Sequence, residues 1–261
     1  MSADAIHPTA IIDAGAELAE DVHVGPYAVI GDGVRIGRGT RIGPHAVIQG
    51  PTTLGEDNRV FQFASVGEIS QDMTARDGDG TRTEIGDRNT IREFVTINRG
   101  TLKEEGVTRI GSDNWIMAYV HIAHDCQIGS HTIFANNASL AGHVRIEDWV
   151  ILGGFTLVHQ FCRIGAHAFT AYSAGLSGDV PPFVTVQGNP ARPRTINVEG
   201  LKRRGFEREE IARIRAAYKL IYRSGKTLDA VREELAAGAA DCPHIARMLA
   251  FLQASKRPLQ R

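Results

Sequence analysis

The feature that most constrains the fold of this chain is an aliphatic residue at every sixth position. The pattern is interrupted twice and resumes in a new register after each interruption. A period of six matches neither the 3.6-residue turn of an α-helix nor the alternation of a simple strand. The repeated positions are Ile6, Ile12, Leu18, Val24, Ile30, Ile36, Ile42, Ile48, Leu54, Val60 and Val66, then Ile85, Ile91 and Ile97, and finally Ile110, Ile116, Ile122, Ile128, Phe134, Leu140, Ile146, Leu152, Val158 and Ile164, followed by Thr170 and Leu176.

A repeat of this length is typical of a short strand followed by a tight turn. Three repeats, about 18 residues, complete one coil, and stacked coils form a prism of parallel strands. A small or compact residue commonly lies two positions before the aliphatic one, as at Ala46 and Thr132, and glycine often follows it. We expect the aliphatic side chains to fill the interior, and glycines such as Gly37 and Gly129 to permit the turn conformations.

The two interruptions predict loops that project from the prism, near residues 68–84 and 98–109, where the aliphatic pattern is lost. Loops on a rigid scaffold commonly carry binding function, although plain surface decoration is the alternative.

Near the C-terminal end the pattern becomes helical. Residues 207–223 have apolar positions at helical spacing and stop at Ser224-Gly225, and residues 227–239 and 243–255 predict two further helices. The sequence therefore predicts a mainly β protein, with a β-helix over residues 1–195 and a small α-helical domain over residues 196–261.

Charge is distributed unevenly along the chain. Residues 189–261 contain 16 Lys and Arg against 8 Asp and Glu, whereas residues 1–188 contain 13 against 22. This asymmetry indicates either an anionic partner near the C-terminal end or simply solvated helices. Nucleic acid is not expected as the partner, because no aromatic residues are interleaved with the basic ones.

Composition also bears on the compartment. The chain has three cysteines without a CxxC pair, no run of 18 apolar residues, and an N-terminus without the basic and apolar regions of a signal peptide. These features predict a reduced, cytoplasmic protein with no stable membrane insertion.

The segment HIAHDC, residues 121–126, carries the chemistry that stands out most. Because Ile122 is an inward position, His121 should point outward or into the turn, and His124 and Asp125 should lie on the turn. Cys126 occupies the compact position before Ile128 and should point inward, as should Cys162 before Ile164. Both cysteines are then predicted to be inert core residues.

Stacking of successive coils predicts the neighbours of this segment. A shift of 18 residues places His124 in register with Gly142 and Gln160, and Asp125 in register with His143. Coils stack about 4.8 Å apart. We therefore expect one outer patch made of His121, His124, Asp125, Gly142, His143 and Gln160.

Three interpretations of this patch are open. It is ordinary surface, a zinc site of the kind that γ-class carbonic anhydrases build between β-helix subunits, or a general-base site. In the third, Asp125 orients a neutral His124 that deprotonates a hydroxyl, and the Gly142 N–H stabilises an oxyanion.

Several segments resemble those of a known family. FQFAS (61–65), EIGDRNTIRE (84–93), HIAHDC, ANNASLAGHV (135–144), VHQFC (158–162), QGNPA (187–191) and EGLKRRGF (199–206) are similar to the UDP-N-acetylglucosamine O-acyltransferases of lipid A synthesis, a branch of the hexapeptide-repeat acyltransferases. The resemblance implies a left-handed β-helix and a homotrimer with active sites between subunits. It also implies transfer of an (R)-3-hydroxyacyl chain from acyl carrier protein to the glucosamine 3-hydroxyl, with no cofactor and no metal.

The resemblance assigns roles to particular residues. His124 matches the general base, Asp125 the residue that orients it, and Gly142 the oxyanion donor. His121, His143 and Gln160 match substrate contacts, and Asp72 matches a contact to the sugar. Asn197, Glu199, Arg203 and Arg204 match the nucleotide end, although Arg203 and Arg204 alone would also fit a solvated helix start. The acidic acyl carrier protein would account for the basic C-terminal part.

Three positions depart from the family pattern. Asn98 stands where the family usually has histidine, although asparagine can still bind a sugar. Thr74, Ala75 and Arg76 follow the QD pair where the family often has lysine, and Arg76 is a candidate substitute. Tyr172 is bulky in the stretch that measures the acyl chain, which predicts a preference for shorter chains. Because Asn98 and Thr74 lie near the acceptor, a 3-amino sugar is an alternative to the 3-hydroxyl.

Overall fold

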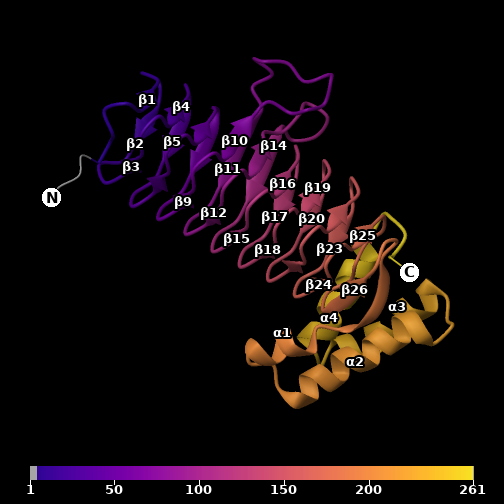
Figure 1. Ribbon diagram of the computed structural model, residues 1–261. Coiled ribbons are helices and arrows are strands. Elements are labelled where there is room, and N and C mark those ends of the chain that lie inside the picture. The colour runs from indigo at the N-terminus through magenta and orange to yellow at the C-terminus, as the bar shows by residue number, and fades with distance from the viewer. Residues whose placement is uncertain (1–4, 261) are drawn as a thin grey trace.

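The computed structural model describes residues 5–260 and is a left-handed parallel β-helix followed by four helices (Figure 1). Three sheets form its faces, and we number them in the order in which the chain visits them. Strands one coil apart pair in the predicted register, as Ile12 with Ile30 and Ile122 with Leu140. The predicted fold class is confirmed.

Each sheet takes strands from successive coils, and neighbouring strands pair in parallel except the last two of sheet 3, which are antiparallel. Sheet 1 contains β1 (Ile11–Ile12), β4 (Val29–Ile30), β7 (Val47–Ile48), β10 (Ser65–Glu68), β13 (Thr96–Asn98), β16 (His121–Ile122), β19 (Ser139–Leu140), β22 (Leu157–Val158) and β25 (Gly175–Leu176). Sheet 2 contains β2 (Glu17–Leu18), β5 (Val34–Ile36), β8 (Thr52–Leu54), β11 (Arg82–Ile85), β14 (Val107–Ile110), β17 (Gln127–Ile128), β20 (Arg145–Ile146) and β23 (Arg163–Ile164). Sheet 3 contains β3 (His23–Val24), β6 (Arg41–Ile42), β9 (Arg59–Val60), β12 (Thr90–Ile91), β15 (Trp115–Ile116), β18 (Ile133–Phe134), β21 (Ile151–Leu152), β24 (Phe169–Thr170), β26 (Val184–Gln187) and β27 (Arg192–Ile196).

The interior of the prism is filled by the repeated aliphatic residues. From Val24 to Leu176 each of these positions is at most 5% exposed. A second interior row is polar, and its groups satisfy one another. Asn58 Oδ1 accepts from the backbone N–H and the side-chain amide of Asn89. Asn114 Oδ1 accepts from the Thr132 backbone N–H at 2.8 Å and hydroxyl at 2.7 Å. These buried asparagine and threonine side chains are therefore paired from coil to coil.

The glycines that follow the aliphatic residues have a different role from the one predicted. Neither Gly37 nor Gly129 adopts the left-handed conformation. A Cβ at Gly37 would instead lie 2.6 Å from the Gly55 carbonyl carbon of the next coil. These glycines permit the close approach of adjacent coils, so the expectation that they serve the turn conformations is wrong.

Non-glycine residues occupy the left-handed position at the corners of the prism, at a cost of about 1–2 kcal/mol each. Many of them are aromatic and stack on the equivalent residue of the next coil. At the corner between sheets 3 and 1, the rings of Tyr27, His45, Phe63, Phe94 and Tyr119 stack with centroids 4.9–5.2 Å apart. Each stacked pair contributes about 0.5–1.5 kcal/mol, which offsets much of the conformational cost.

Two loops leave the prism where the aliphatic pattern is interrupted, between β10 and β11 and between β13 and β14, and project together in Figure 1. The coils remain in register across both, because Val66 pairs with Ile97 and Ile97 pairs with Ile122. The loops therefore project from a continuous scaffold.

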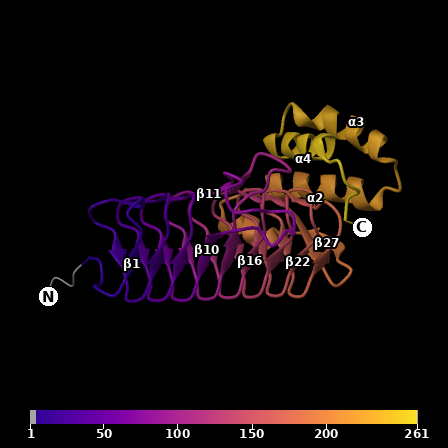
Figure 2. The same cartoon turned by 90° about the horizontal axis from the view of Figure 1, so that it is seen from above.

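The helices are α1 (Val198–Arg203), α2 (Arg208–Arg223), α3 (Leu228–Ala239) and α4 (Pro243–Ala254). Figure 2 shows them beside the C-terminal coils. The three longer helices agree with the prediction, and α1 is an additional short one. Within residues 5–260, no helix combines the length and apolar character needed to cross a membrane.

After α4 the chain returns to the last coil of the prism. The Gln260 side chain accepts from the backbone N–H groups of Ser177 and Gly178 at 2.9 and 3.0 Å, and donates to the Ala191 carbonyl at 2.7 Å. Leu259 forms a parallel bridge with Asp179. The final turns of the β-helix are thus paired with the C-terminal segment.

The contrast between two glycines tests this account of coil spacing. We expect Gly37→Ala to lower the free energy of unfolding by about 1–3 kcal/mol, because the added methyl group meets rigid backbone. The matched variant Gly238→Ala, on the exposed face of α3, should raise it by about 1 kcal/mol through helix propensity. Urea denaturation measures both, and equal effects would contradict the proposed role of Gly37.

Candidate active site

The site is built on the corner between sheets 1 and 2, where the chain turns from β16 into β17. His124 and Asp125 form this turn, and Asp125 takes the left-handed conformation with φ of 59°. The His124 Nδ1 lies 2.9 Å from Asp125 Oδ2. In the neutral tautomer that donates the Nδ1 hydrogen to this carboxylate, Nε2 carries no hydrogen and is left as an acceptor. The predicted pairing of a histidine with an orienting carboxylate is present.

The carboxylate of Asp125 is buried and strongly hydrogen-bonded. Its side chain is 1% exposed. It accepts from the Thr101 N–H at 3.0 and 3.2 Å and from the Thr101 hydroxyl at 2.6 Å. Burial raises the pKa of Asp125, but the hydrogen bonds from His124 and Thr101 outweigh it and leave the pKa lowered. Asp125 therefore stays ionised at neutral pH.

Gly142 lies directly against the His124 ring, as the register predicts. A Cβ at Gly142 would stand 2.4 Å from His124 Cε1 and 2.6 Å from Nε2. Any side chain at this position would therefore displace the imidazole. Within residues 5–260 the Gly142 N–H donates to no protein acceptor. A backbone donor without a protein partner thus adjoins the ring nitrogen that would act as the base.

His143 completes the cluster from the next coil. Its backbone N–H donates to the His124 carbonyl at 3.0 Å, and its ring stacks on Phe161 at 4.4 Å. The His143 Nδ1 makes no hydrogen bond, although Glu104 Oε2 lies 3.5 Å away. His143 and Asp125 are buried, so the predicted outer patch is wrong for these two residues. The loop that carries Thr101 and Glu104 packs against this part of the corner.

His121 and Gln160 lie on either side of this cluster. The His121 Nδ1 is 2.7 Å from the Thr96 hydroxyl, and burial, together with nearby His124, lowers the pKa of His121. The Gln160 side chain is exposed.

Cys126 and Cys162 are fully buried, as predicted, and burial raises the pKa of the Cys126 thiol to about 12. Neither thiol is poised to react at neutral pH.

A groove of about 600 Å³ begins at His121 and runs over the outer face of sheet 1. It passes over β19, β22 and β25 and ends at Ser177, Asn189 and Pro190. Leu157 and Leu176 contribute apolar surface to it. A groove of this shape, lined partly by apolar side chains, suits an extended apolar substituent.

The first loop carries Asp72, which contacts the second loop. Lys103 forms an ion pair with Asp72 and, with hydrogen bonds from Thr74, lowers the pKa of that carboxyl. Arg76 instead donates to the carbonyls of Met73 and Ala75 in its own loop. The cation beside Asp72 is therefore Lys103, a residue that the sequence did not single out.

Asn98 lies at the root of the first loop. Its amide N–H donates to the Ile69 carbonyl at 3.0 Å, while its buried Oδ1 has no hydrogen-bond partner. The side chain is 4% exposed. Asn98 thus anchors the loop and presents one unpaired acceptor.

The four residues predicted for the nucleotide end lie away from the histidine pair, at the corner between sheets 2 and 3. Asn197 caps α1 through Gly200 and donates to the His167 carbonyl at 3.0 Å. Arg204 lies 3.2 Å from His167 Nδ1 and 5.1 Å over the Trp149 ring. Arg203 is exposed, and Glu199 pairs with Lys202 at 3.1 Å. One chain therefore does not bring these residues to His124.

Tyr172 lies on the turn between β24 and β25, at the corner between sheets 3 and 1. Its side chain is 76% exposed, and it does not line the groove within one chain. An effect of Tyr172 on the groove would require a neighbouring subunit.

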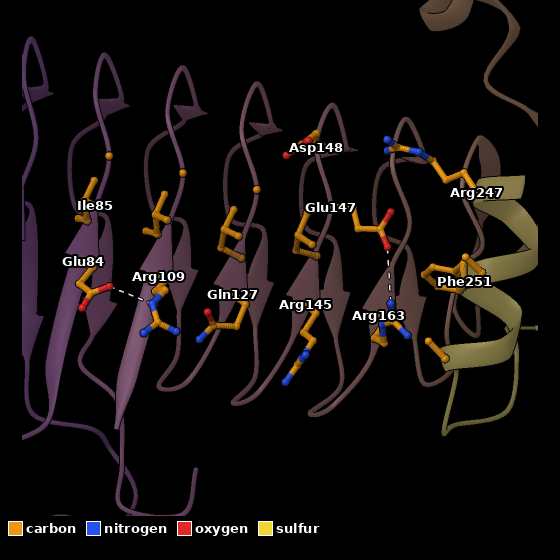
Figure 3. A pocket seen from close by; sticks show the side chains of 18 of the residues that line it. Glu84, Ile85, Arg109, Gln127, Arg145, Glu147, Asp148, Arg163, Arg247 and Phe251 are labelled. Carbon is orange, nitrogen blue, oxygen red and sulfur yellow. Dashed lines mark hydrogen bonds and ion pairs between the residues drawn. The ribbon is translucent and has the colours of Figure 1, made fainter. Parts of the chain in front are cut away.

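A larger cavity, about 1420 Å³, lies between sheet 2 and α4 and is not lined by His124 or Asp125 (Figure 3). Most of its charges are already paired. Glu84 lies 2.9 Å from Arg109, and Glu147 lies 3.6 Å from Arg163. It contains no histidine or cysteine. We place the candidate site at the histidine pair because His124, its carboxylate partner and a backbone N–H without a protein partner lie together there, next to the groove that begins at His121.

A metal centre is the alternative use of the same residues. Ligand atoms of His124, Asp125 and His143 lie within 4.8 Å of one another, and this is the one such group in residues 5–260. However, the Asp125 oxygens already accept from Thr101 and His124. An ion would have to displace these donors, so the donor set fits an orienting carboxylate better than a zinc ligand.

The β-helix with hexad repeats and a histidine–carboxylate pair at its edge define a transferase of the hexapeptide-repeat class. Residues 108–142 match the model of the bacterial transferase hexapeptide, and residues 179–260 match the second domain of UDP N-acetylglucosamine O-acyltransferase.

Relatives with known names extend over almost the whole chain. The acyl-[acyl-carrier-protein]–UDP-N-acetylglucosamine O-acyltransferase of Janthinobacterium sp. (strain Marseille) is 59% identical over 98% of this chain and 99% of its own length. That of Thiobacillus denitrificans is 56% identical with the same coverage. The 1.4 Å structure of this enzyme from Acinetobacter baumannii superimposes with a TM-score of 0.96, at 44% identity over 99% of this chain and 100% of that one. The chain belongs to this family and is an acyltransferase.

The imidazole at the corner between sheets 2 and 3 makes a testable contribution to stability. Burial, reinforced by Arg204 and Arg247, lowers the pKa of His167 to about 3, so the folded protein keeps this ring neutral. The ordinary pKa is about 6.5, so the unfolded chain binds the proton first. The free energy of unfolding should therefore fall as the pH drops below about 6.5. Urea titrations at pH 7.5 and 5 should show a smaller fall in the free energy of unfolding for His167→Phe than for the wild type. An equal fall in the two proteins would contradict this role of His167.

Proposed function

We propose that this enzyme transfers an (R)-3-hydroxyacyl chain from acyl carrier protein to the 3-hydroxyl of UDP-N-acetylglucosamine, the first step of lipid A synthesis. The observation that carries the proposal is the His124–Asp125 pair, with the Gly142 N–H beside it and a groove leading away from His121. The names of the relatives support the donor and the acceptor.

In the proposed reaction His124 Nε2 takes the proton of the sugar hydroxyl as its oxygen attacks the thioester carbonyl. The Gly142 N–H donates to the oxygen that becomes negative. When the C–S bond breaks, the carrier thiolate leaves and takes the proton back from His124. Asp125 holds the imidazole in the required tautomer and stabilises its positive charge. No metal or cofactor enters this scheme.

The remaining residues are proposed to bind the substrates. Asp72, Asn98, His121, His143 and Gln160 would contact the sugar and the acyl group. Asn197, Glu199, Arg203 and Arg204 would bind the nucleotide, where arginine suits the diphosphate. The acidic carrier protein would dock toward the basic C-terminal part. We place the enzyme in the cytoplasm, where these substrates are soluble.

A homotrimer with sites between subunits would unite these two sets of residues. The nucleotide set lies at the corner between sheets 2 and 3, whereas His124 lies at the corner between sheets 1 and 2. The stacked rings at the third corner, among them Tyr27 and Tyr119, are 57% and 55% exposed. Such a row of exposed rings is a surface that a trimer would bury.

Removal of the base tests the proposed function. His124→Ala should lower kcat about 10²–10⁴-fold, while the matched variant His23→Ala, on an exposed strand position of sheet 3, should keep wild-type turnover. The assay uses a panel of acyl carrier protein thioesters, with UDP-N-acetylglucosamine and its 3-amino analogue in competition. Preference for the analogue would change the acceptor from oxygen to nitrogen. Stoichiometric zinc and carbon dioxide hydration, without acyl transfer, would instead indicate a carbonic anhydrase.

Acyl chain selection has a separate test at Tyr172. If this ring shortens the groove in the assembled enzyme, Tyr172→Gly should shift the preferred thioester to a longer chain, by about tenfold in relative kcat/KM for one or two extra methylenes. Tyr172→Phe keeps the bulk of the ring and should keep the wild-type preference. The same preferred length in all three proteins would refute the role of Tyr172.

A further inference from the structure

The arrangement around Asp125 assigns a task to a residue outside the β-helix. Thr101 and His124 bind the same carboxylate oxygen, Oδ2, at 2.6 Å and 2.9 Å respectively. The Thr101 backbone N–H adds contacts of 3.0 and 3.2 Å to the two oxygens. The position of the atom that orients the imidazole is therefore fixed mainly by one residue of the second loop.

That loop is fastened well enough to act as a fixed support. The Arg99 N–H donates to the Glu68 carbonyl, and the Gly100 N–H donates to the Arg82 carbonyl. At its neck, a Cβ on Gly100 would lie 2.1 Å from the Val107 nitrogen, so only glycine lets the two strands of the loop meet. Thr101 itself is 4% exposed. Its hydroxyl is thus held in place beside Asp125.

The backbone of Asp125 is held independently of Thr101. The Asp125 N–H donates to the Thr108 hydroxyl at 2.9 Å, and the residue keeps its left-handed conformation. Removal of the Thr101 hydroxyl would leave the turn in place and loosen only the carboxylate, which would keep the weaker contacts from the Thr101 N–H. The orientation of the His124 ring would change, because its Nδ1 is hydrogen-bonded to that carboxylate.

We propose that Thr101 is a positioning residue for acyl transfer, which holds the Asp125 carboxylate in the one orientation that aims His124 Nε2 at the acceptor. The inference rests on the proposed function and deepens it. It implies that this loop helps to build the catalytic pair as well as to bind substrate. A displacement of about 1 Å in such a group commonly costs about 10²-fold in rate.

A structural effect of the same substitution would look different. Two residues beyond Thr101, Lys103 pairs with Asp72, the proposed sugar contact. If Thr101 only keeps the loop folded, its loss should move Lys103 and raise the KM for the sugar nucleotide. If it acts through Asp125, kcat should fall and that KM should stay nearly constant.

The test compares Thr101→Val, which replaces the hydroxyl by a methyl group, with Thr101→Ser, which keeps the hydroxyl. Thr132→Val is the matched control, because the Thr132 N–H and hydroxyl both donate to one side-chain oxygen, Asn114 Oδ1, in the core. We expect Thr101→Val to lower kcat about 10–100-fold with the acceptor KM within about twofold. Thr101→Ser should recover most of the rate, and Thr132→Val should keep wild-type kcat.

A double-mutant cycle connects the effect to Asp125. In an Asp125→Ala background, Thr101→Val and the smaller Thr101→Ala should cause almost no further loss of kcat, because the group through which they act is gone. Three outcomes would overturn the inference. The losses of kcat from the Thr101 and Asp125 substitutions could be additive, Thr101→Val and Thr101→Ala could both keep the wild-type kcat, or a rise in the acceptor KM could account for the whole loss of activity. A wild-type enzyme that transfers no acyl group would overturn the proposed function as well, so the two failures are distinguishable.

Discussion

The structure depends on the stacking of each coil on the one before it. Backbone hydrogen bonds between residues one coil apart require the coils to approach closely, which glycines such as Gly37 permit. The same approach brings the aliphatic side chains into a continuous interior, where each buried residue contributes about 1.5–3 kcal/mol. Every corner position is then fixed relative to its neighbour in the next coil. The placement of Gly142 against His124 is a consequence of this spacing.

The candidate site is assembled from residues of successive coils and from residues of the two projecting loops. Along the stack, Gly142 and His143 reach His124 and Asp125 from the following coil. Across the stack, the two interruptions of the repeat supply Asp72, Thr101 and Lys103 from loops that the coils hold at their roots. The scaffold thus supplies His124, the proposed base, together with Asp125, and the loops supply Thr101, which binds the Asp125 carboxylate, and the Asp72–Lys103 ion pair.

The sequence predicted the parts of the molecule that follow the repeat. The inward position of Cys126 and the contact between His124 and Gly142 both follow from counting in sixes and eighteens. The partners of Asp125 could not be found in this way, because Thr101 lies in a segment without periodicity. Its hydroxyl reaches the carboxylate only through the folded shape of the loop. The predicted role of the glycines was also wrong. A close backbone approach and a left-handed turn both favour glycine, so the sequence alone does not distinguish between them.

The contacts of Gln260 and Leu259 with the last coil have a consequence for the protein in solution. A parallel β-helix ends in backbone groups that would pair equally well with the end of another copy, so an open end invites fibre growth. Here the C-terminal segment occupies those groups at Ser177, Gly178 and Asp179. The chain therefore limits its own length, and a protein built from an indefinitely extendable repeat remains a particle of defined size.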